Sequence, residues 1–224
     1  DYIFKHFKNI EEFEYNYGGK KCADIIYAQH SENKNCFFIA ILLLENHYSQ
    51  KKSHLKRVYV KELVGEADYV ALCEGDDYWI EESKLQKQID FLDEHPDYSM
   101  SYTGFFTVDD GKKQIYRANY EKLMQRSKTG DILQDLLITN FILTCTTVYR
   151  YDCYFSKLYE KVIYKYDYSL FLTASVLGKC HYLPERTSAY RKTPTGAMAT
   201  QHDLYSRFFH ETKLFFYDGL TNGS

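Results

Sequence analysis

The sequence lacks several features that would assign it to a specialised class of protein. Only 3 of its 224 residues are proline, and no linker rich in proline, glycine and serine divides the chain. A single domain over residues 1–224 is therefore the simplest organisation. No apolar run reaches about 20 residues, the length of a membrane-spanning helix. The longest such run, Cys36–Leu44, predicts a buried strand instead.

A surplus of basic residues is also missing. The formal net charge of -3 argues against a nucleic-acid-binding protein, which would usually be basic. The 6 cysteines form no C-x-x-C pair and the 8 histidines show no ligand spacing, so a zinc site is not expected. Several cysteines lie inside apolar runs, where a free thiol behaves as a small hydrophobic group. This pattern predicts reduced core cysteines in a cytosolic protein.

Strand-like and helix-like patterns alternate along most of the chain. Aromatic, β-branched and other apolar runs predict strands at residues 36–44, 69–73, 99–108, 141–150, 181–183 and 188–191. Apolar periodicity and end signals predict helices at residues 55–64, 83–95, 169–177 and 202–217. The alternation favours an α/β fold in which helices flank a sheet.

The most distinctive feature is a group of carboxylates directly after a predicted strand. The apolar run Tyr69–Cys73 is followed by Glu74, Asp76 and Asp77. In open α/β sheets, ligands bind beyond the carboxyl ends of the strands. A divalent cation such as Mg²⁺ or Mn²⁺ prefers oxygen ligands and would relieve the repulsion between these side chains. The alternative is a solvated acidic turn that caps the following helix.

The segment around these carboxylates resembles a known family. The run "YVALCEGDDYWIEESKLQKQIDFLDEHPDYSMSYTG" is similar to the metal-binding segment of family 2 glycosyltransferases. In one bacterial branch of that family, a strand leads into an E-G-D-D-Y-W motif and then into a helix with the pattern K-L-x-K-Q. Three further segments resemble the family: "LLLENHYSQKKS", "NFILTCTTVYR" and "YDYSLFLTASVLGKCHYLPERTSAYR". The similarity extends over roughly residues 42–217.

The resemblance implies a GT-A-like (Rossmann-like) fold, with a mixed sheet flanked by helices. It implies transfer of a sugar from a nucleotide-diphosphate donor to an acceptor hydroxyl, with inversion, in the synthesis of cell-surface polysaccharides or glycoconjugates. The acceptor would be a sugar or a lipid-linked glycan, and the cofactor would be Mn²⁺ or Mg²⁺. A cytoplasmic location follows, with peripheral contact at the inner face of the membrane where the acceptor is lipid-linked.

The family's metal and donor positions map onto the carboxylate segment. Asp76 and Asp77 would contact the metal and the diphosphate, and Glu74 fills the first place of the motif. Trp79 would either line the donor sugar or anchor the core. Arg191 would pair either with the diphosphate or with a structural carboxylate.

Two positions outside this segment complete the carried-over site. Asp167 stands where the family has its catalytic base, although its residue type also suits a helix N-cap. Arg150, in the place of the family's strand-ending arginine, is expected to be structural.

The chain departs from the family in two places. Thr193 replaces a histidine that follows the family's Y-R pair. The family's opening strands, which bind the nucleotide, are not recognisable. Residues 1–41 are therefore expected to be a divergent or truncated nucleotide-binding part with some strands missing, in which residues 22–36 offer a remnant helix. Residues 42–110 would form the metal-motif region, and residues 111–224 the acceptor-side region with a C-terminal helix.

These departures support a second hypothesis. The chain would then be a non-catalytic glycosyltransferase-like fragment that acts as a binding or scaffold module. A third hypothesis, another metal-dependent phosphoryl-transfer enzyme, has less support, because the sequence contains no P-loop and no kinase-like glycine loop.

Overall fold

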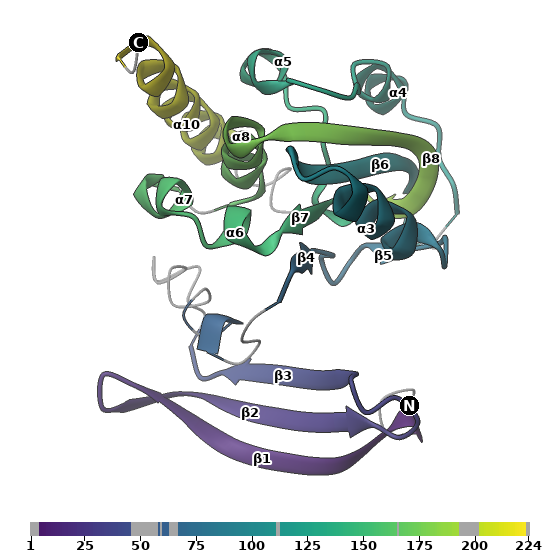
Figure 1. The fold of residues 1–224 in the computed structure, drawn as a ribbon, viewed down its shortest axis with the longest axis vertical. Helices are drawn as coiled ribbons and strands as arrows, with labels where there is room; N and C mark the ends of the chain where they lie inside the picture. The colour runs from purple at the N-terminus through teal and green to yellow at the C-terminus, as the bar shows by residue number, and fades with distance from the viewer. Residues whose placement is uncertain are drawn as a thin grey trace. The chain divides into compact units, whose positions relative to one another are not determined.

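The computed structural model describes residues 5–45, 58, 60–62, 67–110, 113–164, 166–192 and 202–222. The chain divides into two compact units, Asp1–Leu63 and Val64–Ser224, and each has a sheet of its own (Figure 1). The single domain predicted over residues 1–224, with its internal boundaries near residues 41 and 110, stays a prediction, because two compact units can belong to one domain or to two.

The first unit contains an antiparallel sheet in the order β1–β2–β3. Its strands are β1 (Phe7–Tyr17), β2 (Lys20–His30) and β3 (Phe37–Leu43). Gly18 and Gly19 join β1 to β2 with φ of 59° and 75°, the left-handed region that a two-residue hairpin turn requires. The strand predicted at residues 36–44 is confirmed as β3, but its predicted burial is wrong, because Phe37, Leu42 and Leu43 are exposed. The remnant helix at residues 22–36 is wrong, because residues 22–30 lie in β2.

The second unit contains a curled sheet in the order β4–β7–β6–β8–β5. Its strands are β4 (Tyr69–Ala71), β5 (Tyr78–Trp79), β6 (Tyr98–Val108), β7 (Val148–Arg150) and β8 (Lys179–Arg191). The long strand β8 bends around β6 (Figure 1). Only β6 and β8 run parallel, whereas β4 with β7, β7 with β6, and β8 with β5 are antiparallel.

The GT-A-like, Rossmann-like sheet implied by the resemblance is therefore wrong. A Rossmann-like sheet consists mostly of parallel strands that return through crossover helices. Here β7 runs antiparallel to both of its neighbours, and the first three strands form a separate antiparallel sheet. Short turns join those three strands, so no helix returns the chain for parallel pairing. The fold is mixed α/β with one antiparallel sheet and one curled mixed sheet.

Three of the predicted helices are confirmed, as α3 (Lys84–Glu94), α8 (Asp167–Leu177) and α10 (His202–Asn222). The shorter helices are α4 (Ala118–Met124), α5 (Leu133–Ile138), α6 (Tyr151–Tyr154) and α7 (Lys157–Lys161). Residues 168–175 of α8 are buried, because neighbouring helices and the strands β6 and β8 contact it. Most of the helix predicted at residues 55–64 lies outside the described residues. Among the described helices, none combines the length and hydropathy that a membrane crossing requires.

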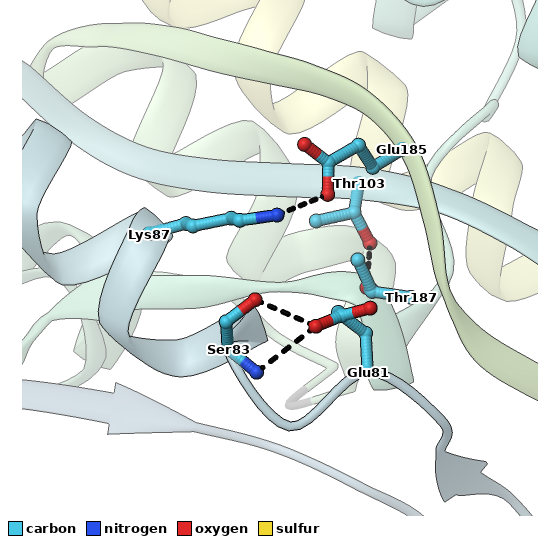
Figure 2. A network of polar contacts seen from close by, with 6 residues as sticks. All are labelled: Glu81, Ser83, Lys87, Thr103, Glu185 and Thr187. Atoms are coloured by element: carbon cyan, nitrogen blue, oxygen red, sulfur yellow. Dashed lines mark hydrogen bonds and ion pairs between the residues drawn. The ribbon is translucent and has the colours of Figure 1, made fainter.

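Polar contacts attach the start of α3 to the curled sheet (Figure 2). Lys87 on α3 donates to the carboxylate of Glu185 on β8. Ser83 does not cap α3 with its side chain; its backbone N–H and its hydroxyl both donate to Glu81. Two buried threonine hydroxyls, 2.7 Å apart, join β6 to β8 beside these contacts. The segment that leads from the carboxylates into α3 is thereby held against β8.

Gly178 joins α8 to β8 where there is no room for a side chain. A Cβ atom at this position would lie 2.9 Å from the Asp97 carbonyl oxygen and 3.1 Å from Ser99 Cβ. Gly178→Ala is therefore expected to lower the free energy of unfolding by about 1–3 kcal/mol, as overpacking does, when measured by urea denaturation. Nothing lies within 4 Å of a Cβ at Gly219, so Gly219→Ala is the control. An equal loss in both variants would contradict the steric explanation.

Candidate functional site

The carboxylates that follow β4 lie in a short turn between two strands of the sheet. The backbone N–H of Asp77 donates to the Glu74 carbonyl oxygen at 3.0 Å, which closes the turn. β5 begins at the next residue and pairs with β8. Glu74 and Asp76 are exposed, and Asp77 is half-buried. The sheet thus fixes both ends of the turn while two of its carboxylates face solvent.

Asp77 lies beside the end of β8. Its Oδ1 accepts the backbone N–H of Arg191 at 2.8 Å. Burial raises the pKa of Asp77, whereas hydrogen bonds from the Arg191 N–H and the Cys145 thiol lower it. The guanidinium of Arg191 also lowers this pKa, so its charge is near the carboxylate. The buried Nε of Arg191 has no hydrogen-bond partner among the described residues, which leaves a donor for an acidic ligand.

Asp167 is the first residue of α8, and the N-cap position belongs to Tyr166. The Asp167 Oδ1 accepts the backbone N–H of Tyr168 at 2.7 Å, and its Oδ2 accepts the Thr144 hydroxyl at 3.3 Å. Burial raises the pKa of Asp167, and these two hydrogen bonds lower it. A half-buried carboxylate with a raised pKa suits a general base better than a freely solvated one.

Thr144 lies between the carboxylates of α8 and those of the β4–β5 turn. Glu74 keeps an exposed surface, but partial desolvation raises its pKa, the Thr144 side chain lowers it, and the charges of Asp77 and Asp167 raise it. Charges that shift the pKa of a carboxylate in this way lie near it. Asp167, which is far from Glu74 in the sequence, therefore lies near it in the fold.

The 3₁₀ turn η1 (Thr144–Thr146) stands at the centre of this group. Its Cys145 carbonyl oxygen accepts the Trp79 Nε1–H at 2.9 Å and the Ser188 hydroxyl at 2.8 Å. Its Thr146 carbonyl oxygen accepts from Gln88 Nε2 at 3.1 Å. Trp79 keeps 37% of its surface exposed, so the residue supports the turn and still presents a face to solvent.

Sequence reasoning missed η1, because it predicted a continuous strand at residues 141–150. Only Val148–Arg150 is a strand. The signal that was available is the run T-C-T-T at residues 144–147, which places three hydroxyl groups inside an apolar stretch. Buried hydroxyls need partners, and such a run is therefore typical of a polar network as well as of a strand.

Lys84, the first residue of α3, supports η1 through its contacts with Gln88 and Trp79. Its ammonium group is buried, donates to Gln88 Oε1 at 2.7 Å and lies 5.0 Å from the centre of the Trp79 ring. Burial lowers the pKa of Lys84 to about 8, and nearby Cys145 and Cys73 partly offset this effect. Sequence reasoning treated this lysine only as part of the helix motif.

The pKa of Lys84 makes stability depend on pH in a defined direction. An unfolded lysine keeps its proton up to about 10.5, whereas the buried one loses it near 8, so the unfolded state binds more protons between these values. The free energy of unfolding of the wild type should therefore rise, relative to that of Lys84→Met, by about 2 kcal/mol as the pH increases from about 8 to about 10. Urea denaturation at both pH values measures this. Lys87→Met, at an exposed position, is the control. If the wild type gained the same free energy of unfolding relative to both variants, the effect would not come from the lowered pKa of Lys84.

Arg150 has the structural role predicted for it. Its Nε donates to the Tyr98 carbonyl oxygen at 2.8 Å. Its guanidinium Nη2 donates to the carbonyl oxygens of Leu92 and His95, where α3 ends. A cation that binds these last carbonyls stabilises the end of the helix.

The donor set fits a divalent cation only in part. In the described residues, no three His, Cys, Asp or Glu side chains are grouped closely enough to hold a metal ion. Mg²⁺ and Mn²⁺ are often bound through one or two carboxylates, with substrate phosphates and water as the other ligands. Asp76 and Asp77 can supply those carboxylates, because Asp76 is exposed and Asp77 is half-buried. The residues thus fit a metal that arrives with a phosphate ligand.

A separate cavity of about 540 Å³ opens at the other end of β4. It is lined by Ala67, Asp68, Tyr69, Ile89, Asp93, Arg150, Tyr151 and Asp152. Neither the β4–β5 turn nor Asp167 contributes to its lining. The cavity therefore does not belong to the carboxylate site.

Comparison with known proteins yields distant relatives only. The chain is 34% identical over 149 residues, 65% of its length, to uncharacterized protein Rv1520 of Mycobacterium tuberculosis, and to the same extent to uncharacterized protein Mb1547 of Mycobacterium bovis. The chain spans about 40% of the length of these relatives. No family model matches the chain. Thr193, the departure from the family's histidine, lies outside the described residues.

Proposed function

We propose that the chain is a glycosyltransferase that moves a sugar from a nucleotide-diphosphate donor to an acceptor hydroxyl, with inversion. The observation that carries the proposal is that η1 contacts both parts of the site: its Thr144 hydroxyl donates to Asp167, and its Cys145 carbonyl oxygen accepts the Nε1–H of Trp79, two residues after Asp77. The resemblance assigned Asp77 and Asp167 to two different tasks in one site. The contacts of η1 support that assignment, although the sheet beneath these residues differs from the one that the resemblance implied.

The donor side of the proposed site consists of Asp76, Asp77 and Arg191. A Mn²⁺ or Mg²⁺ ion held by the two aspartates would supply Lewis-acid stabilisation for the departing diphosphate. The Arg191 Nε–H, without a partner in the described part of the chain, would donate to a diphosphate oxygen. The exposed face of Trp79 lies on the strand that follows the two aspartates and would line the donor sugar.

On the acceptor side of the proposed site, Asp167 would act as the general base. Its carboxylate would take the proton from the acceptor hydroxyl while the hydroxyl oxygen bonds to the anomeric carbon. The bond from that carbon to the diphosphate breaks, and the nucleoside diphosphate leaves. The raised pKa of Asp167 brings the carboxylate closer to the pH at which it works, which favours proton transfer.

The biological setting follows from the same proposal. The acceptor would be a sugar or a lipid-linked glycan, and the reaction would belong to the assembly of cell-surface polysaccharides or glycoconjugates. The enzyme would act in the cytoplasm, and a lipid-linked acceptor would bring it to the inner face of the membrane.

A second function is favoured by a specific observation. Residues 7–43 form an antiparallel sheet and not the strands with which the family binds its nucleotide. A chain without that part would act as a non-catalytic binding module for glycans.

Calorimetric titration separates the two functions. UDP and GDP are titrated into the folded chain with and without Mn²⁺. An enzyme should bind at least one of the nucleotides more tightly in the presence of Mn²⁺, whereas the non-catalytic module should bind neither. The absence of any nucleotide binding would count against the transferase.

A further inference from the structure

Thr144 joins the turn η1 to the proposed base. Its hydroxyl donates to Asp167 Oδ2 at 3.3 Å. A hydroxyl has a single donor hydrogen, and in this structure Asp167 receives it. The side chain is 9% exposed and thus has little access to water as a substitute partner.

The backbone at Thr144 is held from several directions. The Thr147 hydroxyl donates to the Thr144 carbonyl oxygen at 2.7 Å, and the backbone N–H of Thr147 donates to the same oxygen at 3.1 Å. Trp79, Ser188 and Gln88 bind the next two carbonyl oxygens of η1. Because the turn is fixed by β5, β8 and α3, its hydroxyl occupies a defined position relative to α8.

The geometry points to Thr144 as the positioning residue of the base Asp167. This inference rests on the proposed function. The hydroxyl holds one oxygen of Asp167 in place, and the Tyr168 N–H holds the other, so the carboxylate cannot rotate away from the acceptor. Asp76 and Asp77 remain the metal side of the site, where the Arg191 N–H and the Cys145 thiol bind Asp77.

The test compares two substitutions of Thr144. Thr144→Val keeps the shape and removes the hydroxyl, whereas Thr144→Ser keeps the hydroxyl and serves as the matched control. The assay measures UDP or GDP released from UDP-glucose, UDP-galactose, UDP-N-acetylglucosamine and GDP-mannose with Mn²⁺, with water as the acceptor, so that the sugar leaves as the free sugar. We expect Thr144→Val to lower kcat about 10-fold, the value of one hydrogen bond to a charged group, with KM for the donor and UDP affinity unchanged. Thr144→Ser should recover most of the loss.

Three results would overturn the positioning role of Thr144 alone, and one would overturn the proposed function with it. An unchanged kcat in Thr144→Val overturns the positioning role while the transferase stands. If Thr144→Ser lost as much kcat as Thr144→Val, the positioning role would also be overturned. A loss of UDP affinity together with the loss of kcat would overturn it as well, since both results indicate a merely structural role. A folded wild type that releases no nucleotide from any donor overturns the proposed function and the positioning role together.

Discussion

Asp167→Asn is expected to reduce sugar transfer by about 100-fold to 10,000-fold, the range that a general base contributes. Asparagine has the same shape; its Oδ1 can still accept the Tyr168 N–H, and its Nδ2 can donate to the Thr144 hydroxyl oxygen, so the helix start is preserved. It cannot take a proton from an acceptor hydroxyl. Calorimetry should find UDP affinity in the presence of Mn²⁺ unchanged, because the metal side of the site is intact. Steady-state turnover measures the loss.

Asp135→Asn is the matched control for this prediction. Asp135 is also a half-buried aspartate in the first turn of a helix, α5, where it pairs with Lys128 at 2.7 Å. Any effect of removing a negative charge from a helix N-terminus should appear in both variants. If Asp167→Asn retained full turnover, or if both variants lost it equally, Asp167 would not be the base.

Asp77→Asn is expected to abolish the increase in nucleotide affinity that Mn²⁺ provides. A metal contributes several kcal/mol of stabilisation to a phosphate ligand, so the loss should be about 100-fold or more in Kd. The amide can still accept the Arg191 N–H at the position of Oδ1, so the turn should keep its shape. Titration of UDP and GDP with and without Mn²⁺ measures the change.

The control for Asp77→Asn is Asp109→Asn. Asp109 is likewise half-buried and accepts one backbone N–H, that of Lys113, at 2.8 Å. It should keep the full dependence of nucleotide affinity on Mn²⁺. A variant Asp77→Asn that bound nucleotide as the wild type does would remove this aspartate from the metal side.

The elements that could be predicted are those with a strong local pattern. α3 has apolar residues at the spacing of one helical face and a proline just beyond its end, and β6 is a long run of aromatic and β-branched residues. Local patterns of this kind persist when the chain folds, because burial of the same face stabilises the same element. Both were therefore placed to within a residue or so.

Strand direction could not be predicted, because it depends on distant pairing. The alternation of strands and helices indicated only an α/β fold and left the strand directions open, and β7 pairs antiparallel with β4 and β6. The first unit was missed for a different reason. β1 is largely polar and exposed, and its apolar alternation is confined to Phe13, Tyr15 and Tyr17, so the pair Gly18-Gly19 was the main sign of its hairpin.

The roles of the site residues taken from the resemblance stay predictions, and their connections were not visible in the sequence. Asp167 accepts a hydrogen bond from Thr144, which lies in a turn that was predicted as a strand. The burial of Lys84 beside that turn could not be predicted either. Its helical spacing indicates which face of α3 it occupies, but not that the face is covered by η1.

The central claim is that the carboxylates around η1 serve a sugar nucleotide, and one measurement tests it most directly. The wild type and Asp77→Asn are incubated with the same four sugar nucleotides, with and without Mn²⁺, and release of UDP or GDP is followed. The account predicts release from at least one donor by the wild type, dependent on Mn²⁺ and lost in Asp77→Asn. A folded wild type that releases nothing, or a release that persists unchanged in Asp77→Asn, would contradict it.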